Sequence, residues 1–240
     1  MAGVQTLLVE VAVAKLPKYA VRESGDTVEI TERPHGGLSV VLADGQGSGQ
    51  AAKMLSNLVA KKAINLLADG TRDGAAARAV HDYLYAYRRG QVSAELVIIS
   101  ADLATHTIVV SRNTLCPALL AQAGRVERWA EPGTPIGLYR HTKPLIRELP
   151  IEDGAAVVAY SDGIADAGRR RGERFDTAAV VQQLLDGGAT AQAVADEVLA
   201  QALALDERRP ADDMSVVVMT VRLARLADGA RRLVVHFPLP

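Results

Sequence analysis

Apolar residues follow two alternating patterns along this chain. Short apolar runs are typical of strands, and apolar residues that recur every three or four positions are typical of one helix face. The runs predict strands at residues 7–14, 27–31, 38–43, 95–103, 106–111, 117–121, 126–129, 145–149, 155–160, 214–223 and 231–237. The helical spacing predicts helices at about residues 51–67, 74–88, 175–185 and 190–205. Proline and glycine at 131–137 predict a rigid loop, and Asp228-Gly229 predicts a hairpin turn joining the last two strands.

The order of these elements predicts the fold class. Several strands precede two helices, and more strands, two helices and the final strands follow. Strands and helices segregated in this way favour an α+β fold, with antiparallel sheets covered by helices. The 240 residues contain no internal repeat and no Ser/Pro-rich linker, so we expect one domain over 1–240.

Composition narrows the classes of partner and site. Lys and Arg total 27 against 28 Asp and Glu, and aromatic residues make up only 4%. A net charge of −1 with few aromatics argues against a nucleic-acid partner. Cys116 is the single cysteine, which excludes an internal disulfide or a cysteine zinc site, and we expect it to be buried. The chain shows no signal-peptide pattern and no apolar run of membrane-spanning length, so we expect a cytoplasmic protein without a membrane partner.

Two aspartates differ from the other residues of their kind. Asp-Gly occurs seven times, and most of these pairs are typical of turns. Asp44 and Asp162 each close an apolar run without a partner strand directly following, which predicts a carboxylate at the end of a sheet. A simple turn remains the alternative for each of them taken alone.

Further carboxylates lie beside predicted strands. Asp212 and Asp213 directly precede the strand at 214, and Asp26 precedes the strand at 27. Adjacent carboxylates entering a buried strand repel each other, and a cation removes that penalty. Oxygen-only ligands favour Mg²⁺, Mn²⁺ or Ca²⁺ over zinc. Two such ions about 4 Å apart can activate a bridging water for attack at phosphorus.

The glycine-rich segment 45–49 supports a second hypothesis, because a glycine loop before a helix can bind phosphate. The segment lacks the Gly-Lys-Ser/Thr ending of a P-loop and the spacing of a dinucleotide fingerprint. A nucleotide-binding enzyme therefore stays as the weaker alternative.

Four motifs together resemble a known family. They are Val41-Leu42-Ala43-Asp44-Gly45-Gln46-Gly47-Ser48-Gly49, Gly133-Thr134-Pro135-Ile136-Gly137, Ala159-Tyr160-Ser161-Asp162-Gly163-Ile164 and Asp212-Asp213-Met214-Ser215. Their order is similar to that of the metal-dependent protein phosphatases (the PPM or phosphatase 2C superfamily), in particular the SpoIIE-like branch, and the short length resembles RsbX of the stressosome. The resemblance covers about residues 20–221.

The resemblance implies an α-β-β-α sandwich that hydrolyses phosphoserine or phosphothreonine with two Mn²⁺ or Mg²⁺ ions. Asp44 would bridge both ions, with the Gly45 carbonyl on one and Asp162 and Asp212 on the other. Asp44, Asp162 and Asp212 would thus form the catalytic set. Asp26 would be a weaker or water-mediated metal ligand.

The resemblance also implies supporting residues and a partner. Asp213 would stand behind the metal ligands, and Arg22 would contact phosphate. The partner would be a phosphorylated signalling protein, such as a scaffold or antagonist of the STAS type.

Some features leave alternatives open. Gln46, residues 88–94 and residues 111–113 depart from the family pattern, and because none of them is an expected metal ligand they bear on substrate fit more than on catalysis. A catalytically weak interaction module that keeps the fold is a second alternative. The arginines at 169–171 either attract a phosphoprotein or form a solvated charge run. Residues 222–240 extend past the last motif, and we expect an edge strand there.

Overall fold

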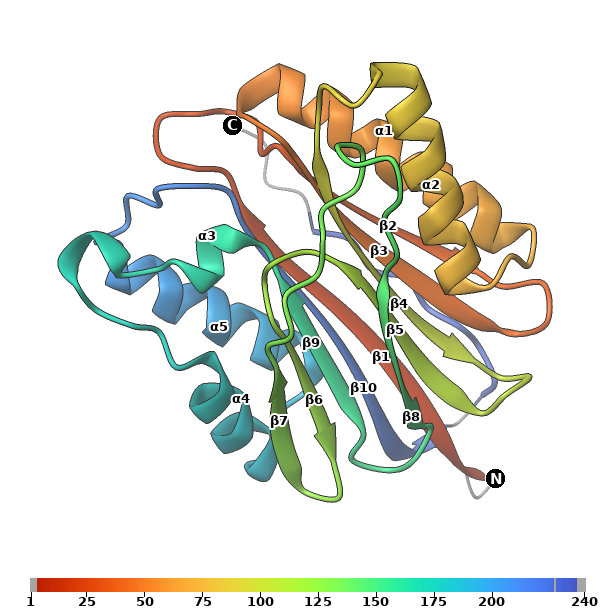
Figure 1. Ribbon diagram of the computed structural model, residues 1–240. Coiled ribbons are helices and arrows are strands. Elements are labelled where there is room, and N and C mark those ends of the chain that lie inside the picture. The colour runs from red at the N-terminus through yellow and green to blue at the C-terminus, as the bar shows by residue number, and fades with distance from the viewer. Residues whose placement is uncertain (1–3, 227, 237–240) are drawn as a thin grey trace.

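The computed structural model describes residues 4–226 and 228–236, which form four layers (Figure 1). Two antiparallel sheets pack face to face in the middle. Helices α1 (Gly49–Ala68) and α2 (Asp73–Arg88) cover one sheet, and α4 (Thr177–Asp186) and α5 (Ala191–Leu205) cover the other. The predicted α-β-β-α sandwich is confirmed.

Each sheet contains five strands in antiparallel pairing. The first sheet has the order β1 (Val4–Leu16), β10 (Met214–Leu226), β9 (Ala156–Tyr160), β6 (Ala118–Gln122) and β7 (Arg125–Trp129). The second has the order β2 (Asp26–Glu32), β3 (Gly37–Gly45), β4 (Ala94–Asp102), β5 (Thr107–Asn113) and β8 (Leu145–Pro150). A short helix α3 (Asp162–Ala165) and a 3₁₀ turn η1 (Arg169–Arg171) follow β9.

Side chains alternate between the two faces of each strand, so the apolar residues form three separate cores. On β3, Val40 and Leu42 face the core between the sheets, whereas Val41 and Ala43 face the helices α1 and α2. A third apolar cluster packs α4 and α5 against the first sheet. Because strand side chains alternate between faces, the same rule decides which polar residues at the strand ends point between the sheets.

The predicted hairpin partner at 231–237 is wrong for residues 231–236, which contain no strand, and Phe237 lies outside the described residues. Strand β10 lies between β1 and β9, so it has no free edge to pair with a following segment. It also continues to Leu226, so the first part of the predicted extension belongs to an interior strand rather than an edge strand. Asp228 instead binds Arg232, with 2.8 Å between Oδ2 and Nη2.

Within the described part of the chain, no helix has both the length and the apolar character needed to cross a membrane.

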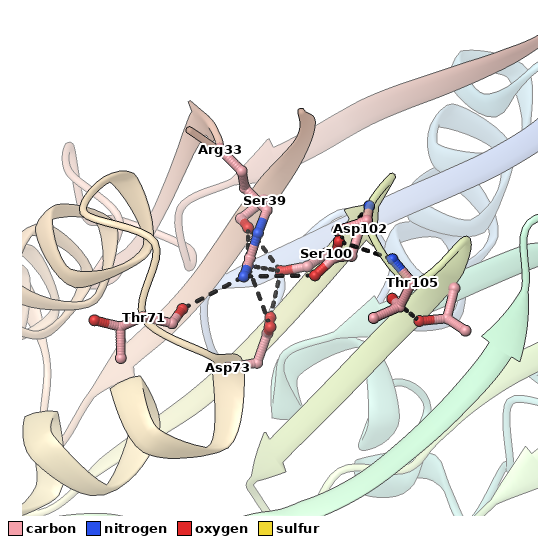
Figure 2. A network of polar contacts seen from close by, with 9 residues as sticks. Arg33, Ser39, Thr71, Asp73, Ser100, Asp102 and Thr105 are labelled. Carbon is pink, nitrogen blue, oxygen red and sulfur yellow. Dashed lines mark hydrogen bonds and ion pairs between the residues drawn. The ribbon is translucent and has the colours of Figure 1, made fainter. Parts of the chain in front are cut away.

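A buried polar network lies where α2 begins against the second sheet (Figure 2). Arg33 Nη1 donates to Ser39 Oγ at 3.1 Å, to Ser100 Oγ at 3.2 Å and to Asp73 Oδ2 at 3.2 Å. Its Nη2 donates to the Thr71 carbonyl at 3.4 Å. Ser100 also donates to Asp73, so the buried cation and carboxylate are both hydrogen-bonded. This network ties the first turn of α2 to β3 and β4.

We expect Arg33→Met to destabilise the protein by about 3 kcal/mol, because it removes the cation from a buried carboxylate. Urea unfolding followed by circular dichroism measures the loss. Arg72→Met is the control, because Arg72 precedes α2 and is exposed. Equal stability of the two variants would contradict the assigned role of the network.

Candidate active site

Three carboxylates form a row across neighbouring strands of the second sheet. Asp26 on β2 lies opposite Asp44 on β3, and Asp44 lies opposite Glu95 on β4. Val28, Leu42 and Val97, each two residues further into its strand, pack in the core between the sheets. Since residues two apart share a strand face, all three carboxylates point between the sheets.

The facing sheet brings two of the sequence motifs together. The Ser161 hydroxyl donates to the Asp213 carbonyl at 3.0 Å and accepts from the Ser215 backbone N–H at 2.9 Å. A Cβ on Gly163 would lie 2.3 Å from the Asp213 carbonyl oxygen. Only glycine therefore lets the start of α3 lie on the backbone at 212–213, which brings Asp162 close to Asp212.

Asp213 fastens the loop that leads to Asp26. Its Oδ1 accepts from the Lys18 backbone N–H at 2.9 Å, and its Oδ2 accepts from the Gly25 backbone N–H at 2.7 Å. Both oxygens of this buried carboxylate are therefore engaged with backbone. The geometry agrees with a supporting position for Asp213, because it holds the loop at 17–25 directly before β2.

Exposure increases from the floor of this site to its mouth. Asp26 is 0% exposed, and its carboxylate oxygens make no hydrogen bond of ordinary geometry within the described residues, although the Ser215 and Ser161 hydroxyls lie near enough to lower its pKa. Asp44 is half-buried, and Asp162 lies exposed at the surface. The Asp212 side chain is 47% exposed. A fully buried carboxylate without a donor is costly, and a bound cation would remove that cost.

The acids raise one another's pKa. Burial raises the pKa of Asp44 to about 9, and the charges of Asp26, Asp162 and Glu95 add to the shift. Burial raises the pKa of Asp26 to about 6, although the hydroxyls of Ser215 and Ser161 oppose the shift. Desolvation and the neighbouring Asp212 raise the pKa of Asp162 to about 7. The centre therefore has a negative potential that suits a hard divalent cation.

The protein oxygens of this centre supply only some of the ligands that a divalent cation needs. Across residues 4–226 and 228–236, no three acidic, histidine or cysteine side chains are already arranged to hold one metal ion. Mg²⁺ usually retains several waters and takes one or two carboxylates, so carboxylate pairs with waters match its chemistry. The unpartnered oxygens of Asp26 and the carboxylates of Asp162, Glu95 and Asp212 around Asp44 fit an oxygen-bound cation.

The glycine-rich segment 45–49 has conformational reasons for its glycines. A Cβ on Gly45 would lie 2.3 Å from the Ala52 carbonyl oxygen, so glycine lets the end of β3 pack against α1. Gly47 and Gly49 have φ values of 100° and 65°, in the left-handed region. Packing and backbone conformation therefore account for these glycines without a bound nucleotide.

The predicted basic residues are exposed at the surface. Arg22 is exposed in the loop before β2. Arg169 pairs with Asp166 at 2.8 Å, and Arg171 pairs with Glu173 at 3.1 Å. Nearby acids therefore balance two of the three arginines at 169–171, which favours a solvated charge run.

Sequence reasoning missed three residues of this centre. Glu95 stands in the carboxylate row, and Lys15 and Lys53 both donate to the Asp26 carbonyl, at 2.5 and 2.7 Å. Burial and the neighbouring Lys53 lower the pKa of Lys15 to about 8. The register that places Glu95 beside Asp44 is a property of strand pairing, which no local pattern reveals.

We expect the free energy of unfolding of the metal-free protein to fall as pH rises from about 4 to about 8. Folding raises the pKa of Asp26 to about 6 and of Asp44 to about 9, from 3.8. The folded state therefore holds more protons than the unfolded state in this window, and stability is lost as pH rises. The window ends at about pH 8, where Lys15 loses its proton in the folded protein before it does in the unfolded protein. Above that pH, Lys15 makes the free energy of unfolding rise with pH and so opposes the effect of the acids.

Urea unfolding in EDTA at several pH values measures this profile. Asp44→Asn should make the free energy of unfolding depend less on pH. Asp186→Asn should leave the dependence unchanged, because Asp186 lies at the exposed end of α4. Stability that rises with pH in this window would show that the acids are not held as described.

Solved structures share the fold at low sequence identity. The PP2C phosphatase domain of Bacillus subtilis SpoIIE, solved with a fragment of its regulatory domain, superposes with a TM-score of 0.74 at 21% identity, covering 92% of this chain and 65% of that one. The catalytic domain of the serine/threonine phosphatase PstP, in complex with two manganese ions, gives 0.67 at 18% identity, with coverages of 90% and 100%. The RsbU and RsbW domains of a Mycobacterium tuberculosis protein give 0.70 at 20% identity, with coverages of 89% and 60%.

The chain thus spans slightly less than two thirds of that SpoIIE chain, and these identities show a shared fold. No curated protein matches the chain in sequence. The model of the family of stage II sporulation protein E matches residues 34–222, which include Asp44, Asp162 and Asp212 but not Asp26. Since this match covers most of the chain, the protein belongs to the SpoIIE family.

Proposed function

We propose that this protein is a phosphatase that hydrolyses phosphoserine or phosphothreonine on a protein partner with two Mn²⁺ or Mg²⁺ ions. The observation that carries the proposal is the unpartnered, fully buried Asp26 in register with Asp44, at the floor of an acidic centre that opens at Asp162. Membership of the SpoIIE family and the two manganese ions in PstP support the same chemistry.

Each acidic residue has its own expected role in metal binding. Asp44 would hold both ions, the Gly45 carbonyl would bind one of them, and Asp162 and Asp212 would bind the other. Asp26 would bind more weakly or through water from the floor. Bound divalent ions supply an activated water and stabilise the charge on the phosphoryl oxygens. Asp213 keeps Asp26 in place through the loop at 17–25.

The partner follows from the mouth of the site and from the family. Asp162 and Asp212 are accessible from solvent, so a phosphorylated side chain on a macromolecule can reach them. The RsbU and RsbW domains and SpoIIE among the structural neighbours support a regulatory phosphoprotein. We infer a bacterial signalling partner, of the STAS type in an RsbX-like stress response, and a cytoplasmic single-domain enzyme.

Two other functions are less well supported. A catalytically weak interaction module would have no reason to retain Asp26 buried without a donor. A nucleotide-binding enzyme would use segment 45–49, whose glycines are already accounted for by packing and backbone conformation.

We expect Mn²⁺ to activate hydrolysis of a phosphothreonine peptide and EDTA to abolish it. Asp44→Asn should lower kcat/KM by more than about 100-fold, since it removes the bridging carboxylate and even outer partners of a metal cost 10–100-fold. Phosphate release measures the rate, and Asp186→Asn should match the wild type. Activity that survives both EDTA and Asp44→Asn would falsify the proposal.

We expect Arg22→Ala to raise KM about tenfold with a smaller effect on kcat, because a charge-assisted hydrogen bond to the substrate phosphate is lost. Steady-state kinetics on the same phosphopeptide separates the two constants. Arg72→Ala is the matched control, because it removes an exposed arginine far along the chain. An unchanged KM excludes Arg22 as a phosphate contact.

A further inference from the structure

A small cavity lies in the core directly beside the carboxylate row. Its volume is about 10 Å³, which is space for one water or one small ion. Asp44, Glu95, Thr114 and Ser161 supply polar groups to its lining. Leu42, Val97 and Tyr160 complete the lining. Two carboxylates and two hydroxyls in this lining can supply oxygen ligands to a single cation.

Glu95 is held firmly at this cavity. Thr114 Oγ1 donates to Glu95 Oε2 at 2.5 Å, and the Leu115 backbone N–H donates to Oε1 at 3.1 Å. The Thr114 hydroxyl itself accepts from the Cys116 backbone N–H at 2.9 Å. The segment between β5 and β6 thus orients the carboxylate. Each carboxylate oxygen can accept more than one partner, so these two bonds leave capacity for a cation.

The register makes a cation at this position favourable. Like charges directly opposite each other on paired strands destabilise a sheet. Asp44 has such a neighbour on both sides, Asp26 on β2 and Glu95 on β4. Asp26 is fully buried and neither carboxylate oxygen has a hydrogen-bond partner within the described residues, so no donor binds this end of the row directly, although the charge of Lys15 acts on it.

We infer that Glu95 is a further cation ligand, which holds a divalent ion together with Asp44 in this cavity. The inference rests on the proposed function and adds Glu95 to the expected ligands Asp26, Asp44, Gly45, Asp162 and Asp212. It also gives Thr114 a positioning role, because its hydroxyl fixes the Glu95 carboxylate.

Titration calorimetry of the metal-free protein with MnCl₂ tests the inference, with no need for activity. We expect Glu95→Gln to weaken Mn²⁺ binding at least about tenfold. Metal-free Glu95→Gln should melt no lower than the wild type, because the Glu95 charge no longer disfavours ionisation of Asp44, but Mn²⁺ should raise its Tm less. A residue with only a structural role would not show this opposite pair of effects. Glu148→Gln is the matched control, because Glu148 is an exposed glutamate on edge strand β8.

The outcomes separate this inference from the proposed function. If Asp44→Asn loses Mn²⁺ binding while Glu95→Gln binds like the wild type, only the role of Glu95 is overturned. If the wild type itself does not bind Mn²⁺, the proposed function fails as well. If Glu95→Gln does not fold, Glu95→Asp replaces it. This variant keeps the charge, but its side chain is one methylene shorter and moves the carboxylate away from Thr114. Unchanged Mn²⁺ binding in Glu95→Asp overturns the inference.

Discussion

The repulsion between carboxylates on neighbouring strands is the constraint on which the functional end of this protein depends. Backbone pairing of β2, β3 and β4 fixes Asp26, Asp44 and Glu95 opposite one another, and the surrounding core keeps water away from Asp26. The sheet cannot relieve the repulsion by moving one side chain, because the register is shared by the whole strand. The energy of the apolar cores therefore holds these acids side by side, and without a cation the acids relieve the repulsion by keeping protons, as the raised pKa of Asp44 and of Asp26 shows.

Close backbone approaches bring the remaining acids to this row. Gly163 lets α3 begin on the backbone of the segment at 212–213, and Gly45 lets β3 end against α1. A Cβ on Gly25 would lie 2.9 Å from the Ala52 Cβ and 3.0 Å from Asp213 Oδ2, so a third glycine packs the loop before β2. The Gly at each of these positions thus acts by admitting a neighbouring segment, whereas Asp69-Gly70 and Asp153-Gly154 form turns.

The sequence was sufficient to predict the layers and several of the acids, and insufficient wherever pairing decides the outcome. Asp44 and Asp162 could be singled out because each ends an apolar run without a returning strand. Glu95 could not, because it begins an ordinary strand and its position beside Asp44 depends on the register of β3 and β4. The same limit explains the wrong hairpin at 231–236. The apolar pattern there resembles a strand, but both edges of β10 are already taken by β1 and β9.

The two ends of the second sheet each contain a buried carboxylate, and only one of these carboxylates is hydrogen-bonded to a cationic side chain. At one end, Arg33 and Asp73 are buried together and hydrogen-bonded through Ser39 and Ser100 (Figure 2). At the other, Asp26 is equally buried, and the nearby Lys15 and Lys53 ammonium groups bind its backbone carbonyl rather than its carboxylate. Cations are thus available to the chain at that end, but Lys15 acts on the Asp26 carboxylate through its charge and not through a hydrogen bond. An arrangement that neutralises one buried carboxylate and leaves the other open is best explained by an external cation for the second.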